Sequence, residues 1–271
     1  MATPVENTPA YVHPELAAIK PDLDLCAHLI GGTRVMQEHA GTYIRKWAEE
    51  KDDVYRIRSK CEAVFEGLGR TLSASVGMLF AKPPQMTWNA GEAAMSEHWQ
   101  NIDAAGTAGP VFAKRFAETA LRDGLGAILV DHPSAPEGVV VTSENEAVLN
   151  LRPTWAAYSR ANVLSWRVGK VNNQAIVTQL VLYEPAAVDV GEFGVGTVDR
   201  YRVLRLLEMP NVDASGVAAE GTHTEAVWQV FEKRKAENGD DVFLPLAPPA
   251  PYKNKAGQIK DTLPVAIAYT G

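Results

Sequence analysis

The chain has 271 residues, of which 46% are hydrophobic and 22% are charged, and its formal net charge is −7. A chain of this length and composition can bury a sizeable core, in one large domain or two smaller ones. Its acidity argues against a general nucleic-acid binder, because such proteins need a basic surface to neutralise phosphates. We also expect no membrane-spanning segment and no secretory signal, since no apolar run is long enough and the N-terminus lacks the pattern.

The N-terminal residues are rich in proline and show no sustained hydrophobic period. Four prolines fall within residues 1–21, so we predict an extended arm there. Pro21 and Asp22 then begin a short helix over residues 23–30, which the pair Gly31-Gly32 ends. Cys26 and Cys61 lie in no metal-ligand spacing, so we expect two reduced thiols in the core of a cytosolic product.

A long amphipathic pattern follows and predicts a helix over residues 51–80. Its apolar residues recur every three or four positions, which places them on one face of a helix. Gly67, Gly69 and Gly77 weaken such a helix and can mark a kink, and Pro83-Pro84 prevents its continuation. The apolar stripe consists of Val54, Ile57, Cys61, Val64, Leu68, Leu72, Val76 and Leu79.

A second helix and a strand are predicted directly after this region. Gly109-Pro110 begins the helix, with proline at the first helical position, and Gly124 stands where a left-handed C-cap belongs. Residues 127–130 follow as a continuously apolar strand, which indicates that both of its faces are covered. We therefore assign residues 22–125 to a helical part of the chain.

The second half reads mainly as strands and turns. Short helices are expected around residues 144–149 and 160–164, loops at 191–196 and 210–221, and an extended proline-rich segment at 245–251. Asn172-Asn173 suits a tight hairpin turn. The fold class is therefore α+β, with N-terminal helices followed by a mixed or antiparallel sheet over residues 126–271. The predicted strands cover residues 166–171, 175–183, 201–208, 226–231 and 263–269.

Catalytic chemistry is weakly represented. Asp131 ends an apolar strand beside His132, and many α/β enzymes place a catalytic or metal-binding carboxylate at that point. Pro133 follows at once and no second acid is near in sequence, so a turn-capping role for Asp131 is favoured over catalysis. The six histidines are scattered and form no metal-binding motif, so we expect no catalytic residue, metal or cofactor.

Three arginines on one predicted strand are the remaining candidates for a site. Arg200, Arg202 and Arg205 could contact phosphate or a neighbouring subunit, although a solvated strand face is an equally good interpretation. The glycine-rich stretch at residues 191–196 has the wrong spacing for a nucleotide-binding loop and is not followed by a helix with a phosphate-binding lysine.

An ordered series of short motifs resembles a widespread family of phage portal proteins. Each motif is weak by itself, but their order and gaps together are fairly specific, and they cover nearly the whole chain after residue 22. They are residues 42–45 (TYIR), 55–58 (YRIR), 77–84 (GMLFAKPP), 101–107 (NIDAAGT), 126–133 (GAILVDHP), 151–155 (LRPTW), 165–167 (SWR), 182–184 (LYE), 201–204 (YRVL) and 264–271 (PVAIAYTG).

The resemblance implies a non-enzymatic subunit of a ring, typically dodecameric, at one capsid vertex. Double-stranded DNA passes through such a ring non-specifically during packaging and ejection. The implied partners are other portal subunits, the major capsid protein, the terminase and a head–tail adaptor, with no membrane. The implied location is the virion, and the host cytoplasm during assembly. A mostly acidic lumen would repel the phosphate backbone, so that DNA slides without binding tightly.

The resemblance covers only the N-terminal, wing half of the family, without stem, clip or crown. We therefore expect a truncated product, a deliberately shortened form or the first part of a split gene, which by itself is a monomer or a weak oligomer. Two alternatives stay open at this point. One is a small α/β enzyme that uses Asp131 and His132, and the other is a different virion protein, such as a head–tail connector or a minor capsid protein.

Overall fold

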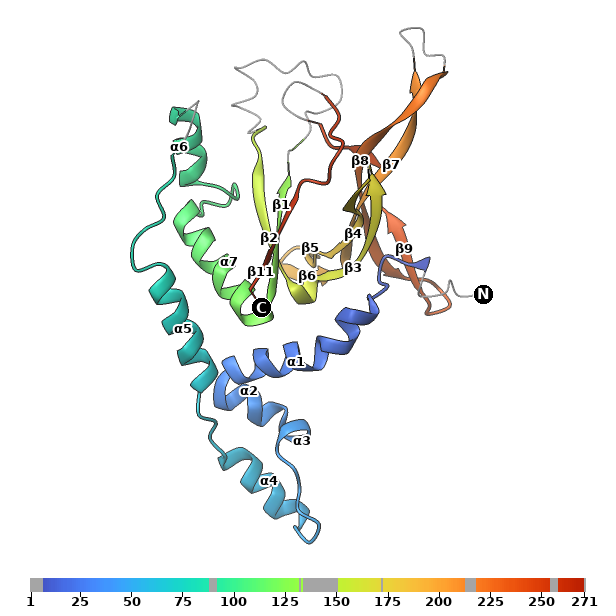
Figure 1. The fold of residues 1–271 in the computed structure, drawn as a ribbon. Coiled ribbons are helices and arrows are strands. Elements are labelled where there is room, and N and C mark those ends of the chain that lie inside the picture. The colour runs from blue at the N-terminus through green and yellow to red at the C-terminus, as the bar shows by residue number, and fades with distance from the viewer. Residues whose placement is uncertain are drawn as a thin grey trace.

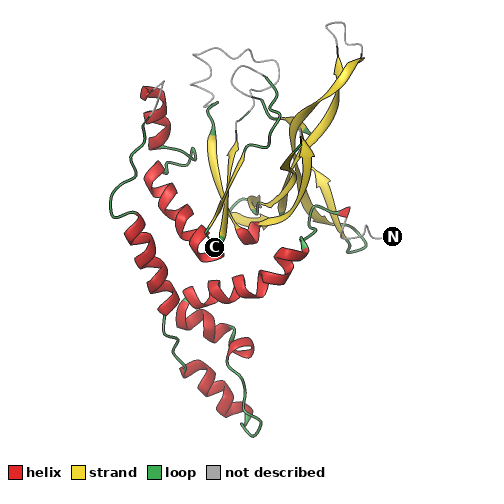
Figure 2. Ribbon diagram, in the orientation of Figure 1, coloured by secondary structure: helices red, strands yellow, loops and turns green. Residues whose placement is uncertain are grey.

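The computed structural model combines N-terminal helices with antiparallel sheets, which confirms the predicted α+β class (Figures 1 and 2). In the figures, the helices of the N-terminal half lie along one side of the strands and extend below them. All pairings among the described strands are antiparallel. The structure describes residues 7–87, 92–131, 133, 151–171, 173–212, 218–253 and 258–270.

The first helix begins earlier than the sequence predicts. Helix α1 covers Pro14–Ile30, so the prediction of an extended arm is wrong for residues 14–21. Pro14 occupies the first turn, where its missing N–H does no harm, and the Glu15 N–H donates to the Nδ1 of His13 over 3.3 Å. Pro21 lies inside this helix. Two short helices follow, α2 (Gly32–Glu38) and α3 (Ala40–Tyr43).

The predicted long helix over residues 51–80 is wrong, because the region forms two helices, α4 (Asp52–Cys61) and α5 (Gly67–Leu79). The connecting segment is extended at Glu62 and binds to α2. The Glu62 carbonyl accepts a hydrogen bond from Gln37 Nε2 over 2.8 Å, and the Val64 N–H donates to Thr33 Oγ1 over 3.1 Å. These long-range bonds replace the intrahelical bonds that a continuous helix would make.

Helices α6 (Glu92–Gln100) and α7 (Gly109–Asp123) are joined by a loop that its own side chains hold. Asp103 Oδ1 accepts hydrogen bonds from the N–H groups of Ala105 and Thr107. Although burial opposes it, these hydrogen bonds to the loop keep the pKa of Asp103 below its usual value. Helix α7 ends at Gly124, whose φ of 74° is the predicted left-handed cap.

A three-stranded sheet of order β11-β1-β2 follows α7 directly. It consists of β1 (Leu125–Asp131), β2 (Thr154–Ser159) and β11 (Val265–Tyr269). One face packs on α7, so closely that a Cβ atom at Gly126 would lie 2.7 Å from the ring of Phe116. The other face packs on the larger sheet, so the prediction that β1 is covered on both faces is confirmed.

The larger sheet has six strands in the order β10-β8-β7-β4-β3, with β9 also paired to β8. The β3–β4 hairpin turns at Asn173, with φ 63°, where the sequence predicts it. A single turn η2 (Arg160–Asn162) precedes this sheet in place of the predicted helix over residues 160–164. The strands are β3 (Val163–Val171), β4 (Gln174–Tyr183), β7 (Arg200–Val212), β8 (Ala218–Lys235), β9 (Asp241–Pro245) and β10 (Ala250–Pro251).

Two predicted loops are partly strand. The long β7–β8 pairing extends as far as Val212 on β7 and Ala218 on β8, because cross-strand pairing continues past Pro210. The glycine-rich stretch turns a separate hairpin of β5 (Ala186–Val190) and β6 (Gly194–Val198). The short helix predicted at residues 144–149 lies outside the described residues.

The main core lies between the two sheets. Ala127, Leu129 and Tyr158 of the three-stranded sheet contact the inner face of the six-stranded sheet, which contributes Leu180, Leu182, Leu204 and Ala226. A smaller cluster of Val181, Tyr201 and Val203 covers the opposite face of the larger sheet. Because successive side chains of a strand point to opposite faces, the larger sheet contributes buried residues to one cluster on each of its two faces.

Two glycine substitutions test the backbone conformations at Gly124 and Gly77. Gly124→Ala places a Cβ on left-handed backbone, so we expect a loss of about 1–2 kcal/mol in unfolding free energy. Gly77 lies inside α5 with open space around it, so Gly77→Ala should instead stabilise by about 0.5–1 kcal/mol. Urea unfolding followed by circular dichroism measures both, and equal effects would contradict the assignment.

Candidate functional site

A charged cluster lies between the two sheets at the end of β1. Arg202 of β7 projects from the face that carries Leu204, into the space between the sheets. Its Nη1 donates to Asp131 Oδ2 over 2.8 Å, and its Nε donates to Glu184 Oε1 over 2.8 Å. The side chain is only 16% exposed. One guanidinium group therefore joins the end of β1 to the segment that leaves β4.

Aromatic side chains surround this ion pair. The Tyr158 hydroxyl donates to the same Glu184 oxygen, and the Arg202 guanidinium lies 5.2 Å from the centre of the Trp228 ring. The hydroxyl of Tyr252 is also buried here, where the charges of Asp131 and Arg202 act on it. The cluster is thus a small group of polar side chains within the otherwise apolar core between the sheets.

The pKa values of the cluster follow from burial and charge. Burial lowers the pKa of Arg202, but the negative charges of Glu184 and Asp131 outweigh this, and the net result is a raised pKa. Burial, followed by the charge of Glu184, raises the pKa of Tyr158 above its usual range. Arg202 is therefore firmly charged and Tyr158 firmly neutral, a state suited to holding strands together.

The structure gives Asp131 a partner that the sequence does not predict, because its carboxylate binds Arg202, 71 residues away in sequence. The residues on both sides of Pro133 lie outside the described part of the chain, so the turn-capping role of Asp131 stays a prediction. His132 lies outside the described residues. Nothing local in the sequence marks Glu184, Tyr158 or Tyr252 as members of a site. A charged residue such as Arg202 within an apolar strand is a signal that a buried partner exists.

The three arginines predicted as one contact do not form one patch. Arg200 donates to Glu232 Oε2 from Nε and Nη2, over 3.1 and 3.0 Å, near the opposite end of the β7–β8 pairing from the hairpin tip. Arg202 is bound in the cluster, and Arg205 is exposed. Strand alternation explains the difference, because residues 200 and 202 share one face of β7 and residue 205 lies on the other.

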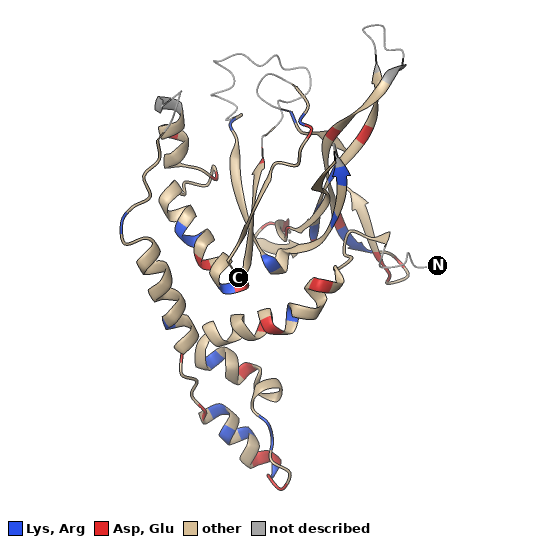
Figure 3. Ribbon diagram, viewed as in Figure 1, with Lys and Arg blue, Asp and Glu red and all other residues tan. Residues whose placement is uncertain are grey.

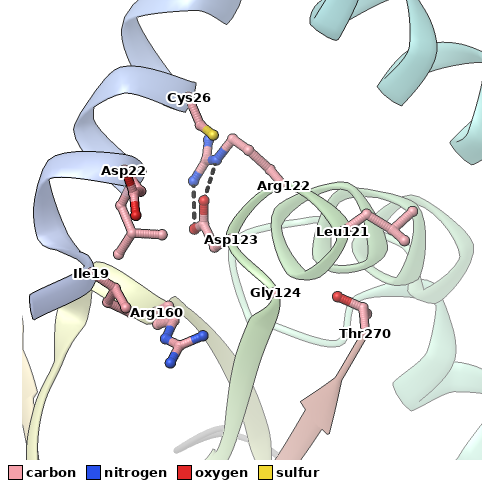
Figure 4. A pocket seen from close by; sticks show the side chains of 10 residues that line it. Ile19, Asp22, Cys26, Leu121, Arg122, Asp123, Gly124, Arg160 and Thr270 are labelled. Atoms are coloured by element: carbon pink, nitrogen blue, oxygen red, sulfur yellow. Dashed lines mark hydrogen bonds and ion pairs between the residues drawn. The ribbon is translucent and has the colours of Figure 1, made fainter. Parts of the chain in front are cut away.

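An open pocket of about 370 Å³ lies where α1, the end of α7, η2 and the end of β11 meet (Figure 4). Arg122 forms a two-point contact with its neighbour Asp123, with Nε to Oδ1 at 2.6 Å and Nη2 to Oδ2 at 2.8 Å. This hydrogen bonding raises the pKa of Arg122. Asp22, Cys26 and Arg160 also line the pocket, so its charged groups include both signs.

The helices α4 and α5, which we call the helical arm (residues 52–79), carry much exposed apolar surface. Figure 1 shows α4 at the end of the molecule farthest from the sheets. Ile57 is 61% exposed and Met78 74%, and Phe65 in the connecting segment is 78% exposed. Of the eight residues of the predicted stripe, only Leu72 and Val76 are buried, so most of the stripe does not pack against the body. Cys61 is exposed as well, so the prediction of a core thiol is wrong there.

The base of α4 is nevertheless well held. Arg58 donates to Glu50, to Glu62 and to the Arg45 carbonyl, and its guanidinium lies 4.8 Å from the Trp47 ring. The hydrogen bond from Arg58 lowers the pKa of Glu50 more than burial raises it. Figure 3 shows several basic residues along α4, among acidic and basic residues interspersed over the rest of the chain. The arm thus carries exposed apolar residues on two ordered helices.

Two further features bear on the kind of site. Among the residues that the structure describes, no three His, Cys, Asp or Glu side chains are grouped to hold a metal ion. No helix in the same part of the chain is both long and apolar enough to span a bilayer.

Removing the central charge of the cluster tests its structural role. Arg202→Leu leaves the partly buried carboxylates of Asp131 and Glu184 without a cation, so we expect a loss of about 1.5–3 kcal/mol in unfolding free energy. The matched control Arg205→Leu alters an exposed side chain on the other face of the same strand and should change stability by no more than about 0.5 kcal/mol. Equal effects in urea unfolding would show that the cluster does not hold the sheets together.

The raised pKa of Tyr183 predicts that the folded state loses stability at alkaline pH. The hydrogen bond to Asp199, followed by burial, raises the pKa of Tyr183 to about 12. The folded state therefore keeps a proton that the unfolded state loses above about pH 10, so stability falls as the pH rises from about 10 to 12. Tyr183→Phe should reduce this fall. Unfolding midpoints at pH 8 and pH 11 measure it, and an unchanged slope in the variant would contradict the assignment.

No protein-family model matches the chain, and the search of curated proteins finds no significant match.

Proposed function

We propose that this chain is a structural subunit of a phage portal ring, part of the conduit through which DNA is packaged and ejected at a capsid vertex. The proposal rests on the ordered motifs that resemble the portal family. The observation that supports it best is the exposed apolar face of the helical arm, which a chain acting alone would not need.

The composition of the helical arm favours contact with another protein. Val54, Ile57, Leu68, Met78 and Leu79 are all exposed there. Exposed apolar surface of this kind commonly marks a protein–protein interaction site. In a ring, each subunit would bury this face against a different surface of its neighbour, because head-to-tail contacts close into rings.

The charge of the chain suits the same role. A net charge of −7 disfavours tight binding of DNA, so a duplex could pass the subunit without being held. In this proposal the major capsid protein, the terminase and a head–tail adaptor are the other partners. The location is the virion, preceded by the host cytoplasm during assembly.

Particle composition tests the proposal directly. Purified DNA-filled particles of the phage that encodes the chain should contain about a dozen copies of it, gathered at one vertex, as a closed ring requires. Quantitative mass spectrometry and antibody labelling in electron micrographs measure copy number and position. Absence from particles, or labelling spread over the whole capsid, would overturn the assignment.

The helical arm can be tested in the same system. Ile57→Glu combined with Met78→Glu places charges on exposed positions, so thermal unfolding of the purified chain should change little while incorporation into particles falls. The control Val168→Glu alters an equally exposed apolar residue on β3 of the body and should leave incorporation intact. Loss of incorporation in the control alone would place the contact on the sheet instead.

A further inference from the structure

Among the residues that the structure describes, strand β11 is a sheet edge without the usual protection against pairing. Natural proteins blunt their edge strands with charges, prolines, bulges or covering segments. Edge strand β3 carries Arg167 and Lys170 with shifts in its register, and β10 contains Pro251. On β2, the outward N–H of Trp155 donates to the Ile102 carbonyl. Strand β11 reads VAIAY, with no charge and no proline.

The hydrogen-bond pattern shows which groups of β11 are free. The Thr270 N–H donates to Gly124 O over 3.1 Å and the Val130 N–H donates to Pro264 O over 2.8 Å. Antiparallel ladders alternate, so Ala266 and Ala268 bond to β1 in the same register. The N–H and C=O groups of Ile267 and Tyr269 therefore point away from β1, toward the open edge of the sheet.

The side chains at this edge are apolar and accessible. Ile267 is 40% exposed and Tyr269 is 74% exposed, and Ala266 is exposed on the opposite face. The Val265 N–H is already used, because it donates to the Leu263 carbonyl, but its C=O faces the same open edge. The edge thus offers two donors and three acceptors in a row, beside apolar side chains.

We propose that a second copy of this chain pairs with β11 through its own β11, in an antiparallel, two-fold symmetric contact. The strand is self-complementary when centred on Ile267. The two Ile267 residues would exchange both of their outward backbone hydrogen bonds, and each Tyr269 N–H would reach the Val265 carbonyl of the other copy. Every free donor of the edge then has an acceptor, which a two-fold contact requires.

The side-chain pairs in this register also match. Ile267 lies opposite itself, and Tyr269 lies opposite Val265, an aromatic and β-branched combination that is favourable across antiparallel strands. The two alanines lie opposite each other, so no side chain obstructs the approach. The contact makes one continuous sheet from the three strands of each copy. It uses a surface different from the helical arm and does not rest on the proposed function.

Cysteine cross-linking tests the register. With Cys26 and Cys61 replaced by Ser, Ile267→Cys puts two thiols on a hydrogen-bonded pair, whose Cα atoms lie about 5.5 Å apart, within disulfide range. The matched control Ala266→Cys is also exposed, but its two copies lie diagonally, at about 7–8 Å, beyond easy bridging. We expect cross-linked dimer to form at least about tenfold faster for Ile267→Cys. Equal rates, or faster linkage through residue 266, would overturn the register.

Native mass spectrometry of the full chain tests the contact itself. At tens of micromolar we expect a species of twice the 29.4 kDa chain mass, and Ile267→Lys should return it to a single chain. Circular dichroism of Ile267→Lys should match that of the unaltered chain, since this side chain is partly exposed. A dimer that persists in Ile267→Lys, or a chain that is monomeric throughout, would overturn the proposal. Particle incorporation through the helical arm is scored separately, so the two proposals can fail independently.

Discussion

The packing of the three-stranded sheet on the six-stranded sheet is the contact on which the rest of the structure depends. Both sheets contribute their most buried residues to it, among them Leu129, Leu182 and Leu204. Arg202 adds a specific polar contact to this apolar one, because its two hydrogen bonds form only when the end of β1 and the end of β4 lie beside β7. Apolar burial supplies most of the stabilisation, and the hydrogen bonds of Arg202 are satisfied only when both carboxylates reach its guanidinium.

The helices attach to this pair of sheets at a few defined places. Helix α7 covers β1 closely, with Phe116 over Gly126. Helix α1 is fastened at its start, where His13 stacks on Trp166 at 4.1 Å and its N–H donates to the Leu164 carbonyl. Beyond these contacts the helices turn away from the sheets, which leaves the helical arm and its apolar residues exposed. The parts most suited to bind partners are thus those that the core constrains least.

The sequence predicts those features that are decided locally. The left-handed cap at Gly124, the apolar strand after it and the turn at Asn173 depend on the conformations that a few adjacent residues allow. The break between α4 and α5 is not predicted because it is decided by Thr33 and Gln37, which lie about thirty and twenty-five residues earlier and bind the connecting segment. The spacing of apolar residues does not reveal such bonds, because it is the same in α4 and in α5 and therefore looks like that of one continuous helix.

The candidate site is only half visible in the sequence for a related reason. Asp131 and Arg202 stand out as charges in apolar strands, but nothing local relates them to each other or to Glu184. Strand alternation does separate Arg205 from Arg202, and this rule alone is enough to divide the three arginines between the two faces of β7. Tyr158 and Tyr252 read as ordinary core aromatics until their hydroxyls are placed beside the ion pair.

Strand β11 has a consequence for the order of folding. It pairs with β1, although about 140 residues separate Leu125 from Tyr269 in the chain. During synthesis, β1 leaves the ribosome and must wait for more than half of the chain before its second neighbour exists, at about 5–20 residues per second. For some seconds β1 is paired with β2 on one side only, and the edge that later binds β11 stays open. Chaperones that bind exposed strands would therefore act on this nascent chain between the completion of β2 and the arrival of β11.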